Sequence, residues 1–535
     1  MLQNMTRSAY EKYKESRKIA NKVIKSKKKI YIKKEIELIE TLNSQNENRK
    51  FYQAVKRMNK GFQPRLDICK DKNGKIIGNK VEIIDRWAEY FEETLNTKET
   101  EQIIERRKYI TVDQQIVESP NEINVEMAIE KQKNNRAPGE DFLTAELFKY
   151  GGRSLLKIIH NLVVTIWENE KMPKEWNTGL ICPIFKKGDK LECKNYRGIT
   201  LLKIAYKILF TIILQKINKF AEYGFRQNRS TTEQIFVMRQ IMEKCYEYNV
   251  PLHILFIDFK QAFDITDREY LLNSMAEYGI PNKLIKLVNM TLENSVAKVT
   301  VGGMISRHFD ITTGVRQGDG LSAVLFNLAL NKVLKELNLN GNILYKTKQA
   351  CAYADDIALI ARNLPALQEM LETIEIAGRS AGLVINETKT KYMKMEVNHG
   401  NNIIQEIKIG NYTFENVVNF KYLGVTINNK GMVSEEINNR IITANRAYFA
   451  NLNLLKSRLL TKPTKLKIYK TLIRPVVSYS AESWTLNKED ENNLRIFERK
   501  IIRRIYGPTY EFGTWKIKSN LEINQILGGE DLVRH

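Results

Sequence analysis

The sequence predicts an α/β fold in which short buried strands end in carboxylates and alternate with amphipathic helices. Residues 252–257 form an apolar run that ends at Asp258, and residues 350–360 hold an Asp-Asp pair between two short apolar runs. Long apolar or amphipathic segments at 323–337 and 365–381 have the spacing of helices. Strands show a period of two residues and helices one of about 3.6, so these segments are distinguishable from sequence.

Size and charge narrow the class of protein. A chain of 535 residues exceeds one typical core, so about two to four subdomains are expected. Its hydrophobic content of 43% excludes a disordered protein. The net charge of +23 indicates a polyanionic partner, with nucleic acid as the first candidate. The alternative is a basic soluble protein without such a partner.

Cysteine and hydropathy patterns predict what the chain does not bind. The five cysteines include no C-x-x-C pair, so neither a zinc site nor a disulfide framework is expected, and a reducing compartment fits. No apolar run approaches the ~18 residues of a membrane span, and the N-terminus has no apolar segment typical of a secretory signal. We therefore expect no membrane partner.

The N-terminal region is predicted to be helical and basic. Residues 1–49 are rich in Lys, Glu and Ile and contain neither Pro nor Gly, which favours one or two helices. A lysine cluster at 25–29 is either a nucleic-acid-binding or nuclear-targeting arm or a solvated helix face. An amphipathic helix is expected at about 83–95, and its pattern indicates packing alone.

A charged hairpin is predicted over residues 176–202. The apolar strand 180–185 runs into Lys186 and Lys187 at a turn, and the chain returns through Arg197. Two lysines at a turn and an arginine on the returning strand would clamp a triphosphate. The alternative is an ordinary charged hairpin.

Another basic loop, at residues 223–232, contains Arg226 and Arg229 around polar residues. Such a loop suits a nucleic-acid backbone, and the alternative is a plain cap for the helix that follows.

Acidic strand ends are the candidate catalytic groups. An acid at the carboxyl end of a buried strand is where α/β folds place ligand-binding groups, so Asp258 and Asp355 are expected to meet from neighbouring strands. Asp355 and Asp356 sit at a predicted hairpin turn, where two adjacent like charges are costly unless a divalent cation or water compensates them. Asp264 is predicted to cap the helix that runs through Leu272 in preference to a role in the site.

The loop 314–322 is punctuated by glycines and precedes a long apolar helix. Gly318 and Gly320 permit close backbone approach, and Gln317 offers both a donor and an acceptor. The alternative is a simple turn. Further along the chain, residues 434–504 are helical and end in a strongly basic stretch that includes Arg499 and Arg503.

The order and spacing of these motifs resemble the palm of a reverse transcriptase. More specifically, the chain is similar to the reverse transcriptases of non-LTR (LINE-type) retrotransposons of animals. The motifs that carry the resemblance lie at 137–139, 186–199, 224–231, 256–264, 314–319, 353–356 and 422–424. It covers residues 135–430 strongly and the C-terminal helices more weakly. Full-length elements of this type carry an upstream endonuclease domain, which we expect this chain to lack.

The resemblance implies a right-hand polymerase, an α+β palm with fingers and a thumb, preceded by a helical basic extension. The implied boundaries are 1–104 for the N-terminal extension, 105–250 for the fingers, 251–433 for the palm, 434–510 for the helical thumb and 511–535 for a C-terminal tail. The reverse transcriptase domain as a whole would span about 170–430.

The resemblance also implies roles for individual residues. Asp258 and Asp355, assisted by Asp356, would bind two Mg²⁺ ions, with Mn²⁺ as a substitute. Lys389 would protonate the leaving group. The residues implied to bind the nucleotide are Lys186, Lys187, Arg197, Phe263 as a gate against the ribose 2′-hydroxyl, Gln317 and Gly318. Those implied to hold the primer are Tyr422, Leu423 and Gly424, and those implied to hold nucleic acid are Arg226, Arg229, Arg499 and Arg503.

The implied function is that of an RNA-directed DNA polymerase, a nucleotidyltransferase that takes an RNA template, a DNA primer or target, and dNTPs. We expect it in the nucleus, with the cytoplasm as the alternative. Residues 220–225 are shorter than the family pattern, so a catalytically dead nucleic-acid-binding remnant is the competing hypothesis. An RNA-templated RNA polymerase is the third, and Phe263 argues against it.

Overall fold

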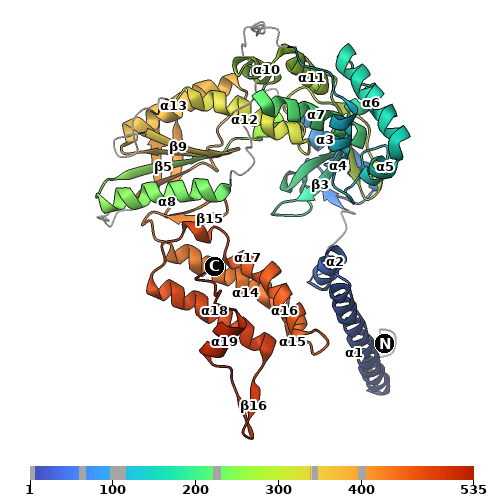
Figure 1. Ribbon diagram of the computed structural model, residues 1–535, viewed down its shortest axis with the longest axis vertical. Helices are drawn as coiled ribbons and strands as arrows, with labels where there is room; N and C mark the ends of the chain where they lie inside the picture. The colour runs from blue at the N-terminus through green and yellow to red at the C-terminus, as the bar shows by residue number, and fades with distance from the viewer. Residues whose placement is uncertain are drawn as a thin grey trace. The chain divides into compact units, whose positions relative to one another are not determined.

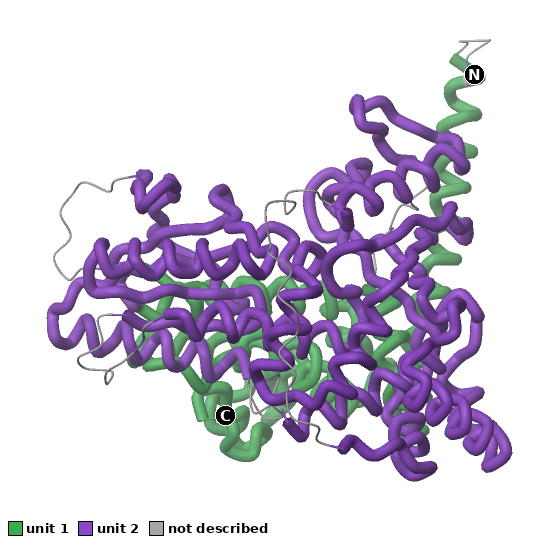
Figure 2. Tube along the Cα trace, turned by 90° about the horizontal axis from the view of Figure 1, so that it is seen from above, with its two compact units in different colours: residues 1–64, 425–428, 432–535 green, residues 65–424, 429–431 purple. Residues whose placement is uncertain are grey.

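The computed structural model describes residues 7–59, 68–96, 116–220, 230–337, 339, 348–395 and 405–534. The chain forms two compact units (Figure 2). One comprises residues 65–424 and 429–431, and the other comprises residues 1–64, 425–428 and 432–535.

A six-stranded sheet with β5 (Leu252–Ile257) near its centre organises the larger unit. β5 pairs antiparallel with β10 (Asp356–Ala361) on one side and with β11 (Lys391–Met395) on the other. The outer strands are β9 (Lys348–Tyr353), β12 (Glu406–Ile409) and β13 (Tyr412–Asn416). All six side chains of β5 are buried, as expected for a strand covered on both faces.

Helices cover both faces of this sheet. α12 (Gly320–Lys335) and α13 (Leu364–Ser380) share a core with the strands on one face. α8 (Thr231–Glu247) lies on the other face, where it contacts β9 (Figure 1). The predicted helices at 323–337 and 365–381 are therefore present. The predicted α/β class is confirmed.

A second sheet of the larger unit contains the predicted charged hairpin. β3 (Thr178–Phe185) pairs antiparallel with β4 (Tyr196–Leu201) and parallel with β6 (Val296–Val301). The short strands β7 (Met304–Ile305) and β8 (Phe309–Asp310) extend it beyond β6. The helices that share a further core beside it are α4 (Glu122–Glu130), α5 (Ala145–Tyr150), α6 (Gly152–Asn169), α7 (Ile204–Phe220), α10 (Arg268–Glu277) and α11 (Asn282–Leu292).

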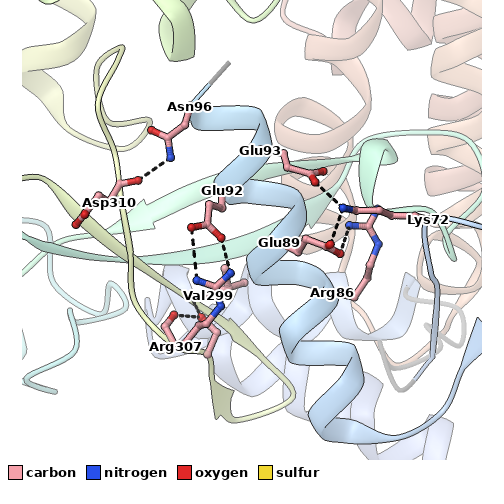
Figure 3. A network of polar contacts seen from close by, with 10 residues as sticks. Lys72, Arg86, Glu89, Glu92, Glu93, Asn96, Val299, Arg307 and Asp310 are labelled. Carbon is pink, nitrogen blue, oxygen red and sulfur yellow. Dashed lines mark hydrogen bonds and ion pairs between the residues drawn. The ribbon is translucent and has the colours of Figure 1, made fainter. Parts of the chain in front are cut away.

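The predicted helix at 83–95 is α3 (Lys80–Leu95), and it packs on the second sheet. Its buried residues, including Trp87 and Phe91, share a core with Ile181 of β3 and Val299 of β6. Polar contacts along the exposed side fasten it further (Figure 3). Lys72 pairs with Glu93 at 2.6 Å, and the Asn96 amide donates to the Asp310 carbonyl at 2.7 Å. Arg307 forms an ion pair with Glu92.

The smaller unit joins the two ends of the chain. α1 (Arg7–Ser44) and α2 (Asn48–Asn59) share a core with the C-terminal helices through buried residues that include Ile39, Phe51 and Tyr469. The Asn43 amide donates to the Thr464 hydroxyl at 2.8 Å. The main C-terminal helices are α14 (Ser434–Ala450), α16 (Lys462–Ile468) and α18 (Lys488–Tyr506), followed by the hairpin β16 (Thr509–Glu511) and β17 (Thr514–Lys516) and by α19 (Asn520–Ile526).

The expected N-terminal extension of residues 1–104 is thus divided. Its first two helices belong with the C-terminal helices, whereas α3 belongs with the sheets. The boundary between the units falls at residue 64 because α1 and α2 bury their apolar faces against the C-terminal core. The lysine cluster at 25–29 lies on a fully exposed stretch of α1, so both interpretations of it stay open. None of the described helices has the length and apolar character needed to cross a membrane.

Candidate active site

The Asp-Asp pair lies at the hairpin between β9 and β10. Ala354 takes a left-handed conformation with φ of 51° in the turn, and Asp356 pairs with Tyr353. Where β10 pairs with β5, Ile357 of β10 lies opposite Ile257 of β5, the residue that precedes Asp258. The structure therefore brings the acid that follows β5 beside the acidic hairpin.

Two carboxylates of this group act on the third. Burial, then the negative charges of Asp355 and Asp258, raise the pKa of Asp356 to about 6. Asp258 is held through its backbone, since its N–H donates to the Thr390 hydroxyl at 3.2 Å and its carbonyl accepts from Asn386 N–H at 2.8 Å. Its carboxylate forms an ion pair with Lys389, with 3.1 Å between Nζ and Oδ2.

Asp258, Asp355 and Lys389 line a cavity of about 290 Å³ in the larger unit, whereas Asp356 does not line it. The predicted site residues that line it are Asp258, Asp355, Lys389, Lys186, Arg197, Phe263 and Gln317. Burial, together with the nearby positive charges of Arg197 and Lys389, lowers the pKa of Lys186. Lys187, which the structure also describes, does not line the cavity. The turn of the charged hairpin therefore directs one of its two lysines toward the carboxylates.

The donor chemistry of the carboxylates fits divalent cations, although the side chains are not yet gathered around one point. In the described part of the chain, no three His, Cys, Asp or Glu side chains are arranged to hold a metal ion as they stand. The Asp258 carboxylate instead takes the Lys389 ammonium as its partner. Carboxylate oxygens are the preferred ligands of Mg²⁺, and mutual repulsion among them is what a cation would relieve.

Phe263 of α9 and residues of α3 contribute to the lining of the cavity. Phe263 stacks on Phe326 of α12, with 4.3 Å between the ring centroids. Tyr90 and Thr94 of α3 also line the cavity, although the sequence indicated only a packing role for this helix. No local signal could have revealed it, because the amphipathic pattern of α3 is that of any helix packed on a sheet.

Asp264 was predicted to cap a helix, and this prediction is wrong. The cap of α10 is Asp267, whose carboxylate accepts from Tyr270 N–H at 2.6 Å. Asp264 lies in the short helix α9 (Ala262–Ile265), and both of its carboxylate oxygens accept from Nε2 of Gln317, at 3.0 and 3.1 Å. Burial raises the pKa of Asp264 to about 7, against the opposing effects of the Gln317 hydrogen bond and the Arg197 charge.

The glycine-rich loop is held in place by close backbone contacts. Thr200 N–H of β4 donates to the Gln317 carbonyl at 2.7 Å. Gly318 has φ of 116°, and a Cβ atom there would lie 2.5 Å from the Thr200 carbonyl oxygen. A Cβ atom on Gly314 would lie 2.2 Å from the Asp264 carbonyl oxygen. Both glycines are therefore required for the protein's own backbone to pack.

The expected primer-binding residues form a turn after β14 (Asn419–Tyr422). Leu423 and Gly424 have φ of 46° and 82°. The buried Tyr422 donates its hydroxyl to the Cys351 carbonyl of β9 at 3.3 Å and lies beside Phe256 of β5. This turn is thus anchored on the strands that carry the acids.

Of the residues expected to bind nucleic acid, Arg226 and Arg229 lie outside the described residues. Arg499 and Arg503 lie on α18 of the smaller unit. Arg503 donates to the Lys518 carbonyl at 3.1 Å and to the Asn520 side chain at 2.7 Å.

The raised pKa of Asp264 predicts a pH-dependent stability difference. The folded-state pKa of this carboxyl exceeds its unfolded value of about 3.9. The free energy of unfolding therefore falls as pH rises from about 4 to 7, because the folded protein must give up a proton that it binds more tightly than the unfolded chain does. Asp264→Asn removes this ionisation, so we expect its Tm to exceed that of the wild type by a few degrees at pH 8 and by less at pH 5. Thermal unfolding at both pH values measures this. A lower Tm for the variant at pH 8 would mean that the ionised carboxylate is stabilising.

Comparisons with known proteins find a reverse transcriptase family and relatives from mobile elements. Residues 184–427 match the family described as "Reverse transcriptase (RNA-dependent DNA polymerase)". The Drosophila melanogaster "RNA-directed DNA polymerase from mobile element jockey" is 26% identical over 451 residues, 77% of this chain and 48% of the relative. The Nasonia vitripennis "Retrovirus-related Pol polyprotein from type-1 retrotransposable element R2" is 23% identical over 323 residues, 56% of this chain and 30% of the relative.

Similarity to solved structures is more distant. A structure of apo telomerase from Candida tropicalis is 12% identical with a TM-score of 0.37, covering 66% of this chain and 67% of that one.

The Xenopus laevis "Transposon TX1 uncharacterized 149 kDa protein" is 25% identical over 275 residues, 49% of this chain and 21% of the relative. The chain spans about half or less of the length of these curated relatives.

Proposed function

We propose, from the match of residues 184–427 to the reverse transcriptase family, that the chain is a right-hand polymerase that copies RNA into DNA by adding deoxynucleotides to a primer 3′-hydroxyl. The observation that carries the proposal is the cavity in the larger unit. Its carboxylates, Asp258 and Asp355, face the cations Lys186 and Arg197. A nucleoside triphosphate requires this combination of groups at its reacting end.

The cationic wall would hold the triphosphate. Lys186 directly follows β3 and Arg197 lies on β4, and charge-assisted hydrogen bonds to phosphate oxygens are among the strongest polar contacts. Phe263, stacked on Phe326, would contact the sugar and exclude a ribose 2′-hydroxyl by its volume. Gln317, with Gly318 beside it, would contact the nucleotide with its side-chain amide.

Reverse transcriptases generally use divalent metal ions. In this chain Asp258, Asp355 and Asp356 would hold two Mg²⁺ ions, with Mn²⁺ as a substitute, and the ions would supply charge neutralisation at the reacting phosphate. Lys389 would give up its present pairing with Asp258 and hold the proton that the leaving group needs. A lysine is suited to this task because its ammonium carries a proton and a positive charge together.

The template and primer would lie along basic surfaces. We place the fingers at about 105–250, the palm at 251–433 and the thumb at 434–510, with an RNA template and a DNA primer or target as partners. The turn Tyr422–Gly424 would steady the primer end, and Arg499 and Arg503 would contact phosphates. Binding through phosphates depends strongly on salt. Copying onto chromosomal DNA would place the protein in the nucleus.

The test is primer extension by the purified chain on an annealed RNA template with dNTPs, with and without Mg²⁺. We expect extension that requires the cation and that prefers dNTPs over ribonucleotides. Tight, salt-dependent binding of the duplex without any extension would contradict the proposal and support the non-catalytic alternative. A preference for ribonucleotides would contradict the role of Phe263.

The two hairpin lysines provide a matched pair for the triphosphate site. Lys186→Ala is expected to raise KM for dNTPs about tenfold, because it removes a charge-assisted contact to phosphate. Lys187→Ala changes the net charge equally but removes a side chain that does not line the cavity, so its KM should change less than about twofold. Steady-state kinetics on one primer and template distinguish them. Equal effects of the two substitutions would show that only the overall charge of the turn matters.

A further inference from the structure

The contact between Asp264 and Gln317 determines which atom of the Gln317 amide a ligand can meet. Nε2 donates to both oxygens of Asp264, at 3.0 and 3.1 Å. A primary amide carries its donor and its acceptor on opposite branches, so the nitrogen turned toward Asp264 leaves Oε1 on the other branch. Both residues line the cavity that the nucleotide would occupy.

Other hydrogen bonds already hold the segment of Asp264 and the loop of Gln317 together without this side-chain contact. Val315 N–H donates to the Phe263 carbonyl at 2.8 Å, and the Thr313 hydroxyl donates to the Asp264 carbonyl at 3.1 Å. Thr200 N–H binds the Gln317 carbonyl from the other side. The Asp264 carboxylate is therefore not needed to position the loop, and its burial is a cost that a purely structural residue would not have to bear.

We propose that Asp264 is a positioning residue, whose carboxylate orients the Gln317 amide so that the cavity presents a hydrogen-bond acceptor, Oε1, to a donor on the incoming nucleotide. This inference rests on the proposed function, since it names the part of the site that would accept a hydrogen bond from a hydroxyl or amino group of the substrate. Without the Asp264 carboxylate, the Gln317 amide could rotate by half a turn and exchange the places of Nε2 and Oε1. In part of the molecules the cavity would then present a donor in place of the acceptor.

The charged and titratable groups near the Asp264 carboxylate are consistent with this role. Arg197 of β4 acts on it as a positive charge, and Tyr90 of α3 lies near enough to be affected by its negative charge. Arg197 would engage the triphosphate, which leaves the Gln317 amide as the hydrogen-bonded partner of the carboxylate.

A swap of the two side chains tests the inference. The variants are Asp264→Asn, Gln317→Glu and the double variant Asp264→Asn/Gln317→Glu. In the double variant, the amide introduced at position 264 can donate to the carboxylate introduced at position 317, which still offers an acceptor, and the net charge equals that of the wild type. We expect Asp264→Asn to raise KM for dNTPs about tenfold with kcat unchanged, because ground-state and transition-state binding are lost equally. The double variant should return KM to within about threefold of the wild type.

A neighbouring carboxylate supplies the control. Asp267→Asn makes the same substitution three residues further on, at a helix cap outside the cavity, and should leave KM unchanged. The inference is overturned if Asp264→Asn leaves KM unchanged, or if the double variant is no better than the single ones. Thermal unfolding of every variant verifies that each one folds.

Nucleotide binding without turnover separates this inference from the proposed function. dNTP affinity is measured on a primer that ends in a dideoxynucleotide, so that no bond can form. If the wild type binds dNTPs but never extends a normal primer, the proposed function fails, whereas a loss of affinity in Asp264→Asn that the double variant restores would still support the inference. Extension by the wild type with equal affinity in all variants would overturn the inference alone.

Discussion

Asp355→Asn is expected to reduce primer extension at least about a thousandfold while leaving affinity for the RNA–DNA duplex within about twofold. The substitution keeps the shape of the side chain and removes one negative charge from the group formed with Asp258 and Asp356. Phosphoryl transfer depends on charge neutralisation and positioning more than on covalent chemistry, so loss of a carboxylate that would hold a cation is severe. Extension assays and duplex binding on the same preparation measure both quantities.

A second Asp-to-Asn change tests whether the loss is specific. Asp310 of β8 is exposed and its backbone carbonyl, not its side chain, accepts the hydrogen bond from Asn96. Asp310→Asn therefore makes the same chemical change outside the cavity and should extend primers like the wild type. Survival of extension in Asp355→Asn would show that the acidic hairpin is not the catalytic centre.

Gly318→Ala is expected to reduce extension about a hundredfold or more, the second largest effect. A Cβ atom there would approach the Thr200 carbonyl oxygen to 2.5 Å, and φ of 116° is strained for any side chain. Because the Thr200 carbonyl oxygen belongs to the backbone of β4, the loop must move away from β4 and take Gln317 with it. Extension kinetics measure the loss, and thermal unfolding shows whether the variant still folds.

Gly303→Ala is the matched control. Gly303 also has a positive φ, of 84°, but a Cβ atom there would meet nothing within 4 Å. Its effect should be limited to the backbone strain of about 1–2 kcal/mol in stability, with extension retained. If the two glycine variants extend equally well, close packing of the Gln317 loop is not needed for activity.

The expectations that followed from local patterns agree well with the elements that the structure contains. The apolar run before Asp258 forms a fully buried strand, and the acidic hairpin is formed as predicted. The charged hairpin containing Lys186 and Arg197 is present as well. These features were predictable because strand periodicity, turns and the cost of burying an acid act within a few residues of the chain.

The role of Asp264 shows where local rules lead to a wrong prediction. Asp264 and Asp267 are both short acids near the start of α10, and either could cap it by sequence alone. Asp267 takes the cap, whereas Asp264 meets Gln317 from a loop more than fifty positions away in the chain. The signal available in the sequence was a second acid six residues after Asp258, but its partner could not be inferred from that spacing.

The order of strands, acids and glycine loops, and hence the class of the protein, could therefore be inferred from local patterns in the chain. Two features became visible in the folded chain alone: α3 contributes Tyr90 and Thr94 to the cavity, and α1 and α2 pack with the C-terminal helices. The physical reason is that an amphipathic helix encodes which of its faces will be buried, but not which surface will bury it. That choice depends on the shape and polar complementarity of segments hundreds of residues apart, which exist only in the folded chain.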